Sequence, residues 1–435
     1  MPGRRAHELA RRRRRDRRAA GTGVSGAIAL VVTFAVNSAI TTGPAHESAS
    51  PTAAVGVAGI IATASTDTAA STVAPTTTTT VRRRYTIAVT GDILLHMPVT
   101  DRAAQYARER DSGTRDFRPM FDPIRALVSG ADLAICHLET PLSADGQNLA
   151  GNPVFSSAPE IAPAIADAGF DGCSTASNHS YDGGDIGVRS TLDHLDVAGL
   201  QHRGSARTEA ERAAPTIYDL GRLRVAHLSY TSFLNGAHPN DPWMIDLVDL
   251  DRMSIVATDA TEARRAGADL VVVSVHWGNE FARAPSGTQV DLADALTAVA
   301  DVDVVVGHHA HVVQPIEQRN GKWVVFGLGN LLSNQHAGSC CPVDSEDGVI
   351  VRFTVEMSEA GASIVGVDFT PTWVDRNTYA IVPVSVAAFN PALDPATRSE
   401  YLRSRERTAE AVRSSGIAVV ETPADVVLNR PSTVG

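Results

Sequence analysis

From Tyr85 onward, short runs of β-branched and apolar residues alternate with segments whose apolar residues recur at helical spacing. This alternation constrains the fold more than any other feature, because it is typical of sheets whose strands are joined by helices that pack on their faces. The apolar runs predict strands at 86–90, 132–137, 171–175, 224–229, 270–275 and 302–306. The segments between them predict helices at 121–128, 160–167, 185–197, 249–265 and 289–299.

The later part of the chain has a different pattern. Runs at 314–318, 323–326, 349–356 and 363–369 predict antiparallel hairpins, with AsnGly and AlaGly at two of the turns. No segment repeats another. We therefore expect one α/β (α+β) domain over residues 83–390 that combines two kinds of sheet. Residues 391–435 are expected to form a C-terminal helical extension, with a charged helical stretch at 397–414 and a last strand within 417–427.

The first 82 residues differ in composition from the domain. A basic head, residues 1–20, precedes an apolar segment, 21–42, and residues 43–82 are rich in Ala, Thr and Ser, a composition that predicts a disordered linker. Arginines followed by an apolar run are typical of a membrane-targeting element whose basic side stays in the cytoplasm. The run is slightly shorter than the roughly 20 residues of a membrane span, yet longer than a signal-peptide core of about 7 to 15. A transmembrane signal anchor and a cleaved signal peptide both fit, and either places the domain outside the cytoplasm, as a single-pass membrane protein or a secreted one.

Charge and cysteine content limit the function classes. The chain has a net charge of −11, although its first 18 residues carry nine arginines against two acidic residues, so the rest is more acidic still. Such a domain repels nucleic acid. The four cysteines are too few for a disulfide-built scaffold. Cys136 and Cys173 lie in predicted strands and are expected to be small buried thiols, whereas Cys340 and Cys341 could pair with other partners or with each other.

Polar residues follow five of the predicted strands, at the ends where the loops of an α/β sheet converge. The segments are GDILLH (91–96), CHLETP (136–141), ASNHSYDGG (176–184), VHWGNE (275–280) and GHHAH (307–311). Taken singly, most have an ordinary explanation as a turn, a helix cap or a buried histidine. His308, His309 and His311 are harder to explain in that way, since three imidazoles after a buried strand are costly without partners.

Together the segments hold the residue types of a two-metal hydrolytic site, which needs carboxylates and imidazoles from several strands and one carboxylate that bridges the ions. The predicted metal ligands are Asp92, Glu139, Asn178, His276, His309 and His311. A histidine that does not bind metal is needed as a proton donor, and His179, directly after Asn178, is predicted to be that residue. Asp182 is predicted to assist it.

In this order the motifs resemble those of the calcineurin-like metallophosphoesterase superfamily and, more closely, those of the CapA family of poly-gamma-glutamate capsule biosynthesis proteins. The matching motifs are GlyAsp at 91–92, HisLeuGlu at 137–139, AsnHis at 178–179 with Asp182 and Gly184, HisTrpGly at 276–278 with Glu280, HisAlaHis at 309–311 with Gln314, and GlyAsn at 329–330. The resemblance extends over residues 85–375. Three positions depart from it: His137 replaces the usual Asn, Ala310 replaces the usual Pro, and His96 lies four rather than two residues beyond Asp92.

The resemblance implies a sandwich of mixed sheets flanked by helices, with two divalent ions, Mn, Fe or Zn, at the strand ends. It implies that Asp92 and His311 hold one ion, that Asn178, His276 and His309 hold the other, and that Glu139 bridges them. Water activated by the ions would attack phosphorus or a carbonyl carbon, and His179 would protonate the leaving oxygen. Asp182 and Glu280 could orient His179 and His276, or could equally cap helices.

Three functions fit these observations. The first is a membrane-anchored, extracytoplasmic metal-dependent hydrolase of capsule, poly-gamma-glutamate or other cell-surface polymer biosynthesis, whose partners are the membrane and the polymer. The second is a non-catalytic component of a polymer synthesis or export complex that keeps the fold. The third is a secreted metal-dependent nucleotidase.

Overall fold

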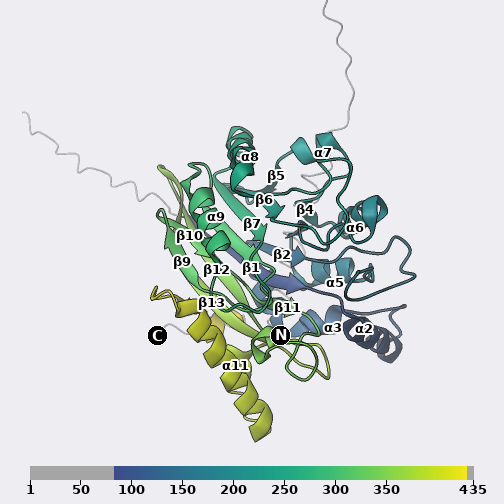
Figure 1. Ribbon diagram of the computed structural model, residues 1–435. Coiled ribbons are helices and arrows are strands. Elements are labelled where there is room, and N and C mark those ends of the chain that lie inside the picture. The colour runs from purple at the N-terminus through teal and green to yellow at the C-terminus, as the bar shows by residue number, and fades with distance from the viewer. Residues whose placement is uncertain (1–82, 429–435) are drawn as a thin grey trace, which may run out of the picture. The chain divides into compact units, whose positions relative to one another are not determined.

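The computed structural model describes residues 83–428, so the predicted basic head, apolar segment and linker lie outside the described residues. Within 83–428 the strands form two sheets, with helices on their outer faces (Figure 1). No helix in that part of the chain has both the length and the apolar character needed to cross a bilayer.

The first sheet is mixed, with strand order β14-β13-β12-β1-β2-β3-β4, and β11 and β15 pair with β1 and β13. Its strands are β1 (Arg83–Ile93), β2 (Leu133–Leu138), β3 (Gly172–Ser174), β4 (Gln201–Arg203), β11 (Asn330–Leu332), β12 (Asp347–Ser358), β13 (Gly361–Val374), β14 (Ile381–Pro383) and β15 (Val420–Glu421). The strands β1 to β4 are parallel, whereas β12 and β13 form a long antiparallel hairpin beside β1.

The second sheet has the order β5-β6-β7-β8-β10-β9. Its strands are β5 (Thr216–Asp219), β6 (Arg224–Thr231), β7 (Leu270–His276), β8 (Val304–His308), β9 (Ile316–Arg319) and β10 (Lys322–Val325). The central strands β6, β7 and β8 are parallel. Every residue of β7 is buried, which explains why its sequence is apolar apart from Ser274 and His276, because a parallel strand is covered on both faces.

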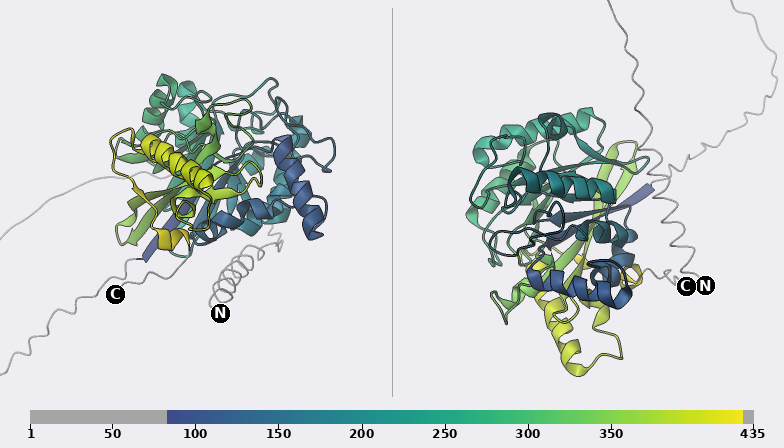
Figure 2. Two further views of the ribbon diagram at one scale, coloured as in Figure 1. Left: turned by 90° about the horizontal axis from the view of Figure 1, so that it is seen from below. Right: turned by 90° about the vertical axis from the view of Figure 1, so that its right-hand side faces the viewer.

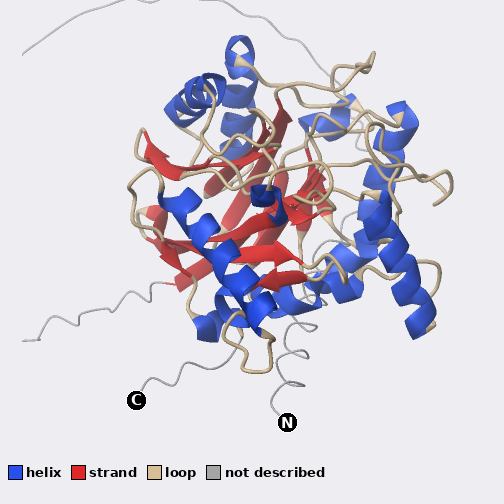
Figure 3. Cartoon of the chain, turned by 60° about the horizontal axis from the view of Figure 1, so that its bottom comes forward, coloured by secondary structure: helices blue, strands red, loops and turns tan. Residues whose placement is uncertain are grey.

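Helices cover the outer face of each sheet, and α10 (Val384–Ala387) and α11 (Pro395–Arg413) pack beside the hairpin of the first sheet instead (Figures 2 and 3). The helices are α2 (Met97–Arg110), α3 (Arg118–Phe121), α4 (Arg125–Ser129), α5 (Ile161–Ala168), α6 (Gly184–Ala198), α7 (Glu209–Ala213), α8 (Met253–Arg265), α9 (Gly287–Ala298), α10 (Val384–Ala387), α11 (Pro395–Arg413) and α12 (Ala424–Val427). Side chains of α2, α5 and α6 pack in one core with the first sheet, and those of α8 and α9 in another with the second.

The two sheets pack face to face through a third core. Along β1, Ile87 and Val89 point into this core between the sheets, whereas Ala88 points into the helix layer. Val272 of β7 and Val304 of β8 enter the core from the second sheet. The alternation of the strand therefore decides which layer each side chain joins, and the expected domain of mixed sheets flanked by helices is confirmed.

The predictions fail where local chemistry interrupts a pattern. The helix expected at 121–128 is broken into the end of α3, a 3-10 turn at Asp122–Ile124 and α4, because Pro123 lacks the amide hydrogen that a continuous helix needs. Helix α2 was not predicted, since its buried stripe consists of small residues. The last strand expected within 417–427 shrinks to the two residues of β15, and α12 follows.

The C-terminal helix α11 is fastened to the hairpin of the first sheet. Arg407 donates two hydrogen bonds to Asp347 at the start of β12, at 2.7 and 2.9 Å, and Ser404 donates a third at 2.7 Å. Asp347 is buried. The extension predicted from residue 391 thus packs on the sheets as α11, while the boundary at residue 390 stays a prediction.

All four cysteines are paired. Cys136 and Cys173 face each other in the parallel register of β2 and β3 and form a disulfide, so the prediction of two buried thiols is wrong about their chemistry. The adjacent Cys340 and Cys341 form the second disulfide, as one of the two alternatives expected. No free thiol is left in residues 83–428, which contain every cysteine of the chain.

Candidate metal centre

The polar residues singled out in the sequence come together where the parallel strands of both sheets end. Asp92 lies near the end of β1, and Glu139 directly follows β2. Asn178 lies in the loop after β3, and His276 is the last residue of β7. Because both sheets contribute, the site lies at the junction of their strand ends, and all of these side chains are buried.

Glycine is required beside Asp92. The amide of Asp92 donates a hydrogen bond of 2.9 Å to the carbonyl of Gly329. A Cβ atom at Gly91 would lie 2.1 Å from the same carbonyl oxygen, so only glycine allows this approach. The GlyAsp pair therefore fits β1 closely against the segment that runs from Gly329 into β11, whose first residue is Asn330.

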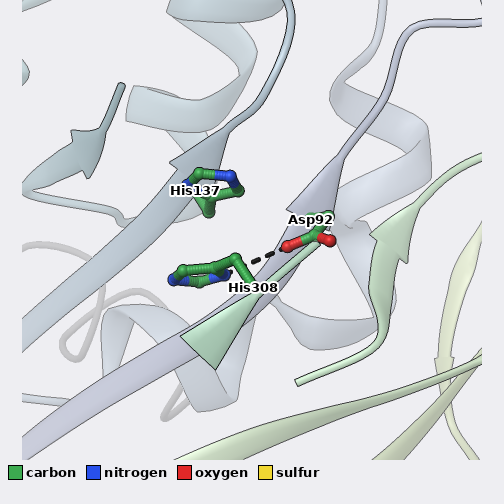
Figure 4. A group of neighbouring side chains, drawn as sticks. All are labelled: Asp92, His137 and His308. Atoms are coloured by element: carbon green, nitrogen blue, oxygen red, sulfur yellow. Dashed lines mark hydrogen bonds and ion pairs between the residues drawn. The ribbon is translucent and has the colours of Figure 1, made fainter. Parts of the chain in front are cut away.

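Asp92 is held by residues 308–311, the last residue of β8 and the three that follow it, which we call the histidine loop. His308 Nδ1 lies 3.0 Å from Asp92 Oδ1, as Figure 4 shows, and the amide of His309 donates to Oδ2 at 3.0 Å. His311 Nδ1 lies 3.2 Å from Oδ2. Burial alone would raise the pKa of Asp92, but the contacts with His308 and His311 outweigh it and lower that pKa well below its usual value. Asp92 is therefore an ionised carboxylate.

The histidine loop has a strained backbone. His309 and His311 have φ angles of 86° and 55°, in the left-handed region that residues other than glycine rarely adopt. The hydrogen bond from the His309 amide to Asp92 and one of 2.8 Å from the Phe281 amide to the Ala310 carbonyl hold this conformation. Such strain is typical of functional sites, and here it brings both imidazoles to within ligand distance of Glu139.

Glu139 is the most unusual group of the site. Its side chain is fully buried, and neither carboxylate oxygen has a hydrogen-bond partner among residues 83–428. The imidazole of His311 lies 3.7 Å away, from Nε2 to Oε1, too far for a hydrogen bond. Burial raises the pKa of Glu139 well above its usual value. A carboxylate in this state is costly unless a cation lies beside it.

His276 lies between an amide and another imidazole. Its Nε2 is 2.9 Å from Asn178 Oδ1, and its Nδ1 is 3.0 Å from His137 Nε2. Burial lowers the pKa values of His276 and His137 well below the usual value, and it lowers that of His309 to about 3. These imidazoles are neutral, which is the form that binds metal.

The predicted proton donor, His179, is held by Asp182 and Phe155. His179 Nδ1 is 2.7 Å from Asp182 Oδ2, and Asp182 also accepts a hydrogen bond of 2.8 Å from the amide of Phe155. The ring of Phe155 packs edge-on against His179, with centroids 4.7 Å apart. The nitrogen Nε2 is left facing the exposed amide of Asn235, at 3.4 Å.

The structure brings the predicted site residues together and adds two. Three groups of side chains place their ligand atoms within 4.8 Å of one another: Asp92, His137 and His308; His137, Glu139 and His276; Glu139, His309 and His311. His137 and His308 were not predicted as members. The sequence did give a reason to consider each of them. His308 is one of three histidines in the 308–311 segment, and His137 stands where the family usually has Asn.

The structure also places three further residues that the sequence analysis discussed, Glu280, Asp182 and His96. Glu280 was expected as a residue that could orient His276, but it is exposed, and His137 and Asn178 hold both ring nitrogens of His276 instead. Asp182 does orient His179. His96 is not in any of the three groups and accepts a hydrogen bond of 3.3 Å from the amide of Asn334.

The residues fit divalent metal ions. Both oxygens of Glu139 and the Nδ1 atom of His309 are buried without a hydrogen-bond partner in residues 83–428, as expected for atoms whose partner is an ion. Two ligand atoms about 2.1 Å from one ion at a right angle lie roughly 3 Å apart. Asn178 Oδ1 and His276 Nε2, 2.9 Å apart, meet that condition. The donors are imidazole, carboxylate and amide, which suit Mn, Fe or Zn.

Comparisons with known proteins find a family and curated relatives that match this chain. The family described as bacterial capsule synthesis protein PGA_cap matches residues 86–335, more than half of the chain. The capsule biosynthesis protein CapA of Bacillus anthracis is 27% identical over 262 residues, 58% of this chain and 60% of that protein. The PGA biosynthesis protein CapA of Bacillus subtilis is 32% identical over 190 residues, 40% of this chain and 46% of that protein.

Among solved structures, the calcineurin-like phosphoesterase YfkN of Bacillus subtilis has a TM-score of 0.38 at 14% identity, with 76% of this chain and 99% of that chain covered. The match to either curated CapA protein spans less than two thirds of that protein's length. The family match covers every strand that carries the site, from Asp92 to the histidine loop. The chain therefore belongs to the PGA_cap family of bacterial capsule synthesis proteins.

Proposed function

We propose that this chain is a metal-dependent hydrolase of the metallophosphoesterase type that acts outside the cytoplasm on a cell-surface polymer such as poly-gamma-glutamate or capsule. The observation that carries the proposal is Glu139, a buried carboxylate that no hydrogen-bond donor of residues 83–428 satisfies and that lies among the imidazoles of His276, His309 and His311. In such a setting a bridging carboxylate is stabilised by two cations.

We assign the side chains to two ligand sets around Glu139. Asp92 and His311, whose Oδ2 and Nδ1 atoms lie 3.2 Å apart, would hold one ion. Asn178, His276 and His309 would hold the other, and the rings of the two histidines are 4.7 Å apart. Two divalent ions at these positions would supply an activated water and positive charge that stabilises the developing oxyanion.

The chain's own residues supply the proton and restrict access. Asp182 fixes the ring of His179 through Nδ1, so that Nε2 is the nitrogen that can hold or donate a proton at the leaving oxygen. Phe155 packs against His179, and Phe233 packs edge-on against His309 at 4.8 Å. Phe233 thus covers a ligand imidazole and Phe155 covers the proton donor, and where such rings exclude water the electrostatic interactions are stronger.

Three observations support the cellular role. The family and the relatives named CapA indicate capsule or polyglutamate biosynthesis. All four cysteines are in disulfides, which is typical of proteins outside the cytoplasm. The basic and apolar pattern before residue 43 supports a membrane attachment. Protease added to intact spheroplasts should digest the domain in the membrane fraction, and a protected domain would contradict this placement.

Metal content and hydrolysis test the proposed function together. The full-length protein should bind about two Mn, Fe or Zn ions per chain and hydrolyse phosphodiester or phosphomonoester substrates, and chelation should remove both properties reversibly. The reason is that the ions supply the activated water and the charge for the transition state. Stoichiometric metal without turnover on any phosphoester or on the amide bonds of poly-gamma-glutamate would favour the non-catalytic component of a polymer synthesis complex, and absence of bound metal would contradict the site itself.

A further inference from the structure

A row of hydrogen bonds crosses the site from the first sheet to the second. It begins at Ser174 of β3, whose Oγ is 2.7 Å from His137 Nδ1. It continues from His137 Nε2 to His276 Nδ1 at 3.0 Å and from His276 Nε2 to Asn178 Oδ1 at 2.9 Å. The Ser174 hydroxyl also reaches the carbonyl of Cys136 at 3.4 Å. All four side chains are buried, so water does not satisfy them instead.

The parallel register fixes the first contact. His137 and Ser174 are direct neighbours across β2 and β3, and the disulfide between Cys136 and Cys173 joins the pair of residues just before them. His276 ends β7 in the opposite sheet. The row therefore connects two layers of the sandwich at the point where the predicted ligands meet.

The donors and acceptors of the row are consistent in two arrangements. In one, Ser174 donates to His137, His137 Nε2 donates to His276, and His276 Nε2 donates to Asn178. In the other, His276 Nδ1 donates to His137, His137 Nδ1 donates to Ser174, and Ser174 donates to the carbonyl of Cys136. Each group carries one proton in both arrangements, so no net protonation separates them. Only the second frees the lone pair of His276 Nε2.

We propose that His137 and Ser174 are positioning residues that hold His276 in the tautomer that presents Nε2 to a metal ion. Ligand histidines generally donate their second N–H to a partner that fixes the ring, and here an imidazole backed by a serine takes that part. The inference rests on the proposed function, because it assigns His276 to a metal ion.

The geometry favours this role over direct metal binding by His137. Both of its ring nitrogens are engaged, one with Ser174 and one with His276. Its ring is stacked on that of His308, with centroids 4.0 Å apart and planes 15° from parallel. Parallel rings stacked in this way do not direct their lone pairs at one point, so His137 and His308 do not form a shared pair of ligands.

The test measures affinity rather than turnover. Mn²⁺ is titrated calorimetrically into the full-length metal-free protein, and Co²⁺ is followed by its visible absorption. His137→Leu, which removes the acceptor, should weaken binding at one site about 10- to 100-fold without a change in the number of ions. His137→Asn keeps an acceptor and should stay within a few-fold of wild type. Ser174→Ala should weaken binding by an intermediate factor.

His227 offers a matched control. It is a fully buried histidine that pairs with Ser274 Oγ at 3.0 Å on neighbouring strands of the second sheet. It belongs to none of the three groups of possible metal ligands. His227→Leu should leave the Mn²⁺ affinity at the wild-type value, whatever it does to thermal stability. An equal loss of affinity in this variant would overturn the assignment, because it would show a general effect of losing a buried imidazole.

The possible outcomes distinguish a failure of the positioning role from a failure of the metal site. Wild-type affinity in His137→Leu would overturn the positioning role of His137 and Ser174. Loss of one ion in this variant, together with a changed Co²⁺ spectrum, would also overturn it, because that result would make His137 a metal ligand. If His137→Leu does not fold, Ser174→Ala tests the positioning role in its place, since an unchanged affinity in that variant would equally overturn it. A wild-type protein that binds no ion would refute the proposed function and the positioning role together. Normal binding by wild type, with the same affinity in His137→Leu and Ser174→Ala, would refute the positioning role alone.

Discussion

Replacing Glu139 by glutamine is expected to make the metal-free protein more stable and to abolish its metal-dependent hydrolysis. In the metal-free state the carboxylate is buried and neither oxygen has a hydrogen-bond partner in residues 83–428, so removing its charge should raise the free energy of unfolding by at least about 1 kcal/mol. In the metal-loaded state the same change removes the group proposed to bridge the ions. The metal-dependent gain in melting temperature should therefore disappear.

The measurement is thermal unfolding of wild type and Glu139→Gln, each with a chelator and with Mn²⁺, beside an assay of phosphoester hydrolysis. Glu346→Gln is the control, since Glu346 is also buried but accepts hydrogen bonds from Trp373 Nε1 at 3.2 Å and from the Ala337 amide at 3.1 Å. That change should not stabilise the protein, and it should leave the gain on adding Mn²⁺ intact. A Glu139→Gln variant that is destabilised without metal and still gains stability with it would contradict the bridging role.

Replacing His179 by glutamine should lower the rate of hydrolysis in a way that depends on the leaving group. For alkyl phosphodiesters, whose alkoxide needs a proton, we expect a loss of roughly 10² to 10⁴-fold in kcat/KM. For nitrophenyl esters, whose leaving group departs as the anion, the loss should be much smaller. Metal content should not change, because His179 belongs to none of the three groups of possible metal ligands.

Two variants frame this result. Asp182→Asn keeps the hydrogen bond that orients the ring but not its charge, so its loss should follow the same dependence on the leaving group with a smaller amplitude. His194→Gln is the matched control, since within residues 83–428 the one hydrogen bond of the His194 ring is to the carbonyl of Ser143. Equal losses for both classes of ester in His179→Gln would argue against proton donation and for a purely structural role.

The strands could be predicted from the sequence because a strand that is buried on both faces consists almost entirely of apolar residues. The strand Leu270–His276 is apolar almost throughout, and the hairpin of β9 and β10 turns at Asn320 and Gly321, which have φ angles of 50° and 77°. Helix α2 lacks a recognisable pattern of large apolar residues, since Val99, Ala103 and Ala107 make a narrow stripe of small residues. The disulfide of Cys136 and Cys173 depends on strand register, which a single sequence does not specify.

The candidate site could be predicted where a polar residue stands directly at a strand end. Asp92, Glu139 and His276 are of this kind, and their position after apolar runs placed them at one edge of the fold. The roles of His137 and His308 depend on which residues face each other across two sheets, and that is a property of the packing. Asn235 lies in a loop whose approach to His179 has no signal in the sequence.

The most direct test of the account is a crystal structure of the Mn²⁺-loaded protein with anomalous diffraction measured at the manganese edge. We expect two anomalous peaks about 3.5 to 4 Å apart, with Glu139 between them, Asp92 and His311 at one, and Asn178, His276 and His309 at the other. Peaks at other residues, or two peaks that do not share Glu139, would contradict the two-metal centre on which the proposed function depends.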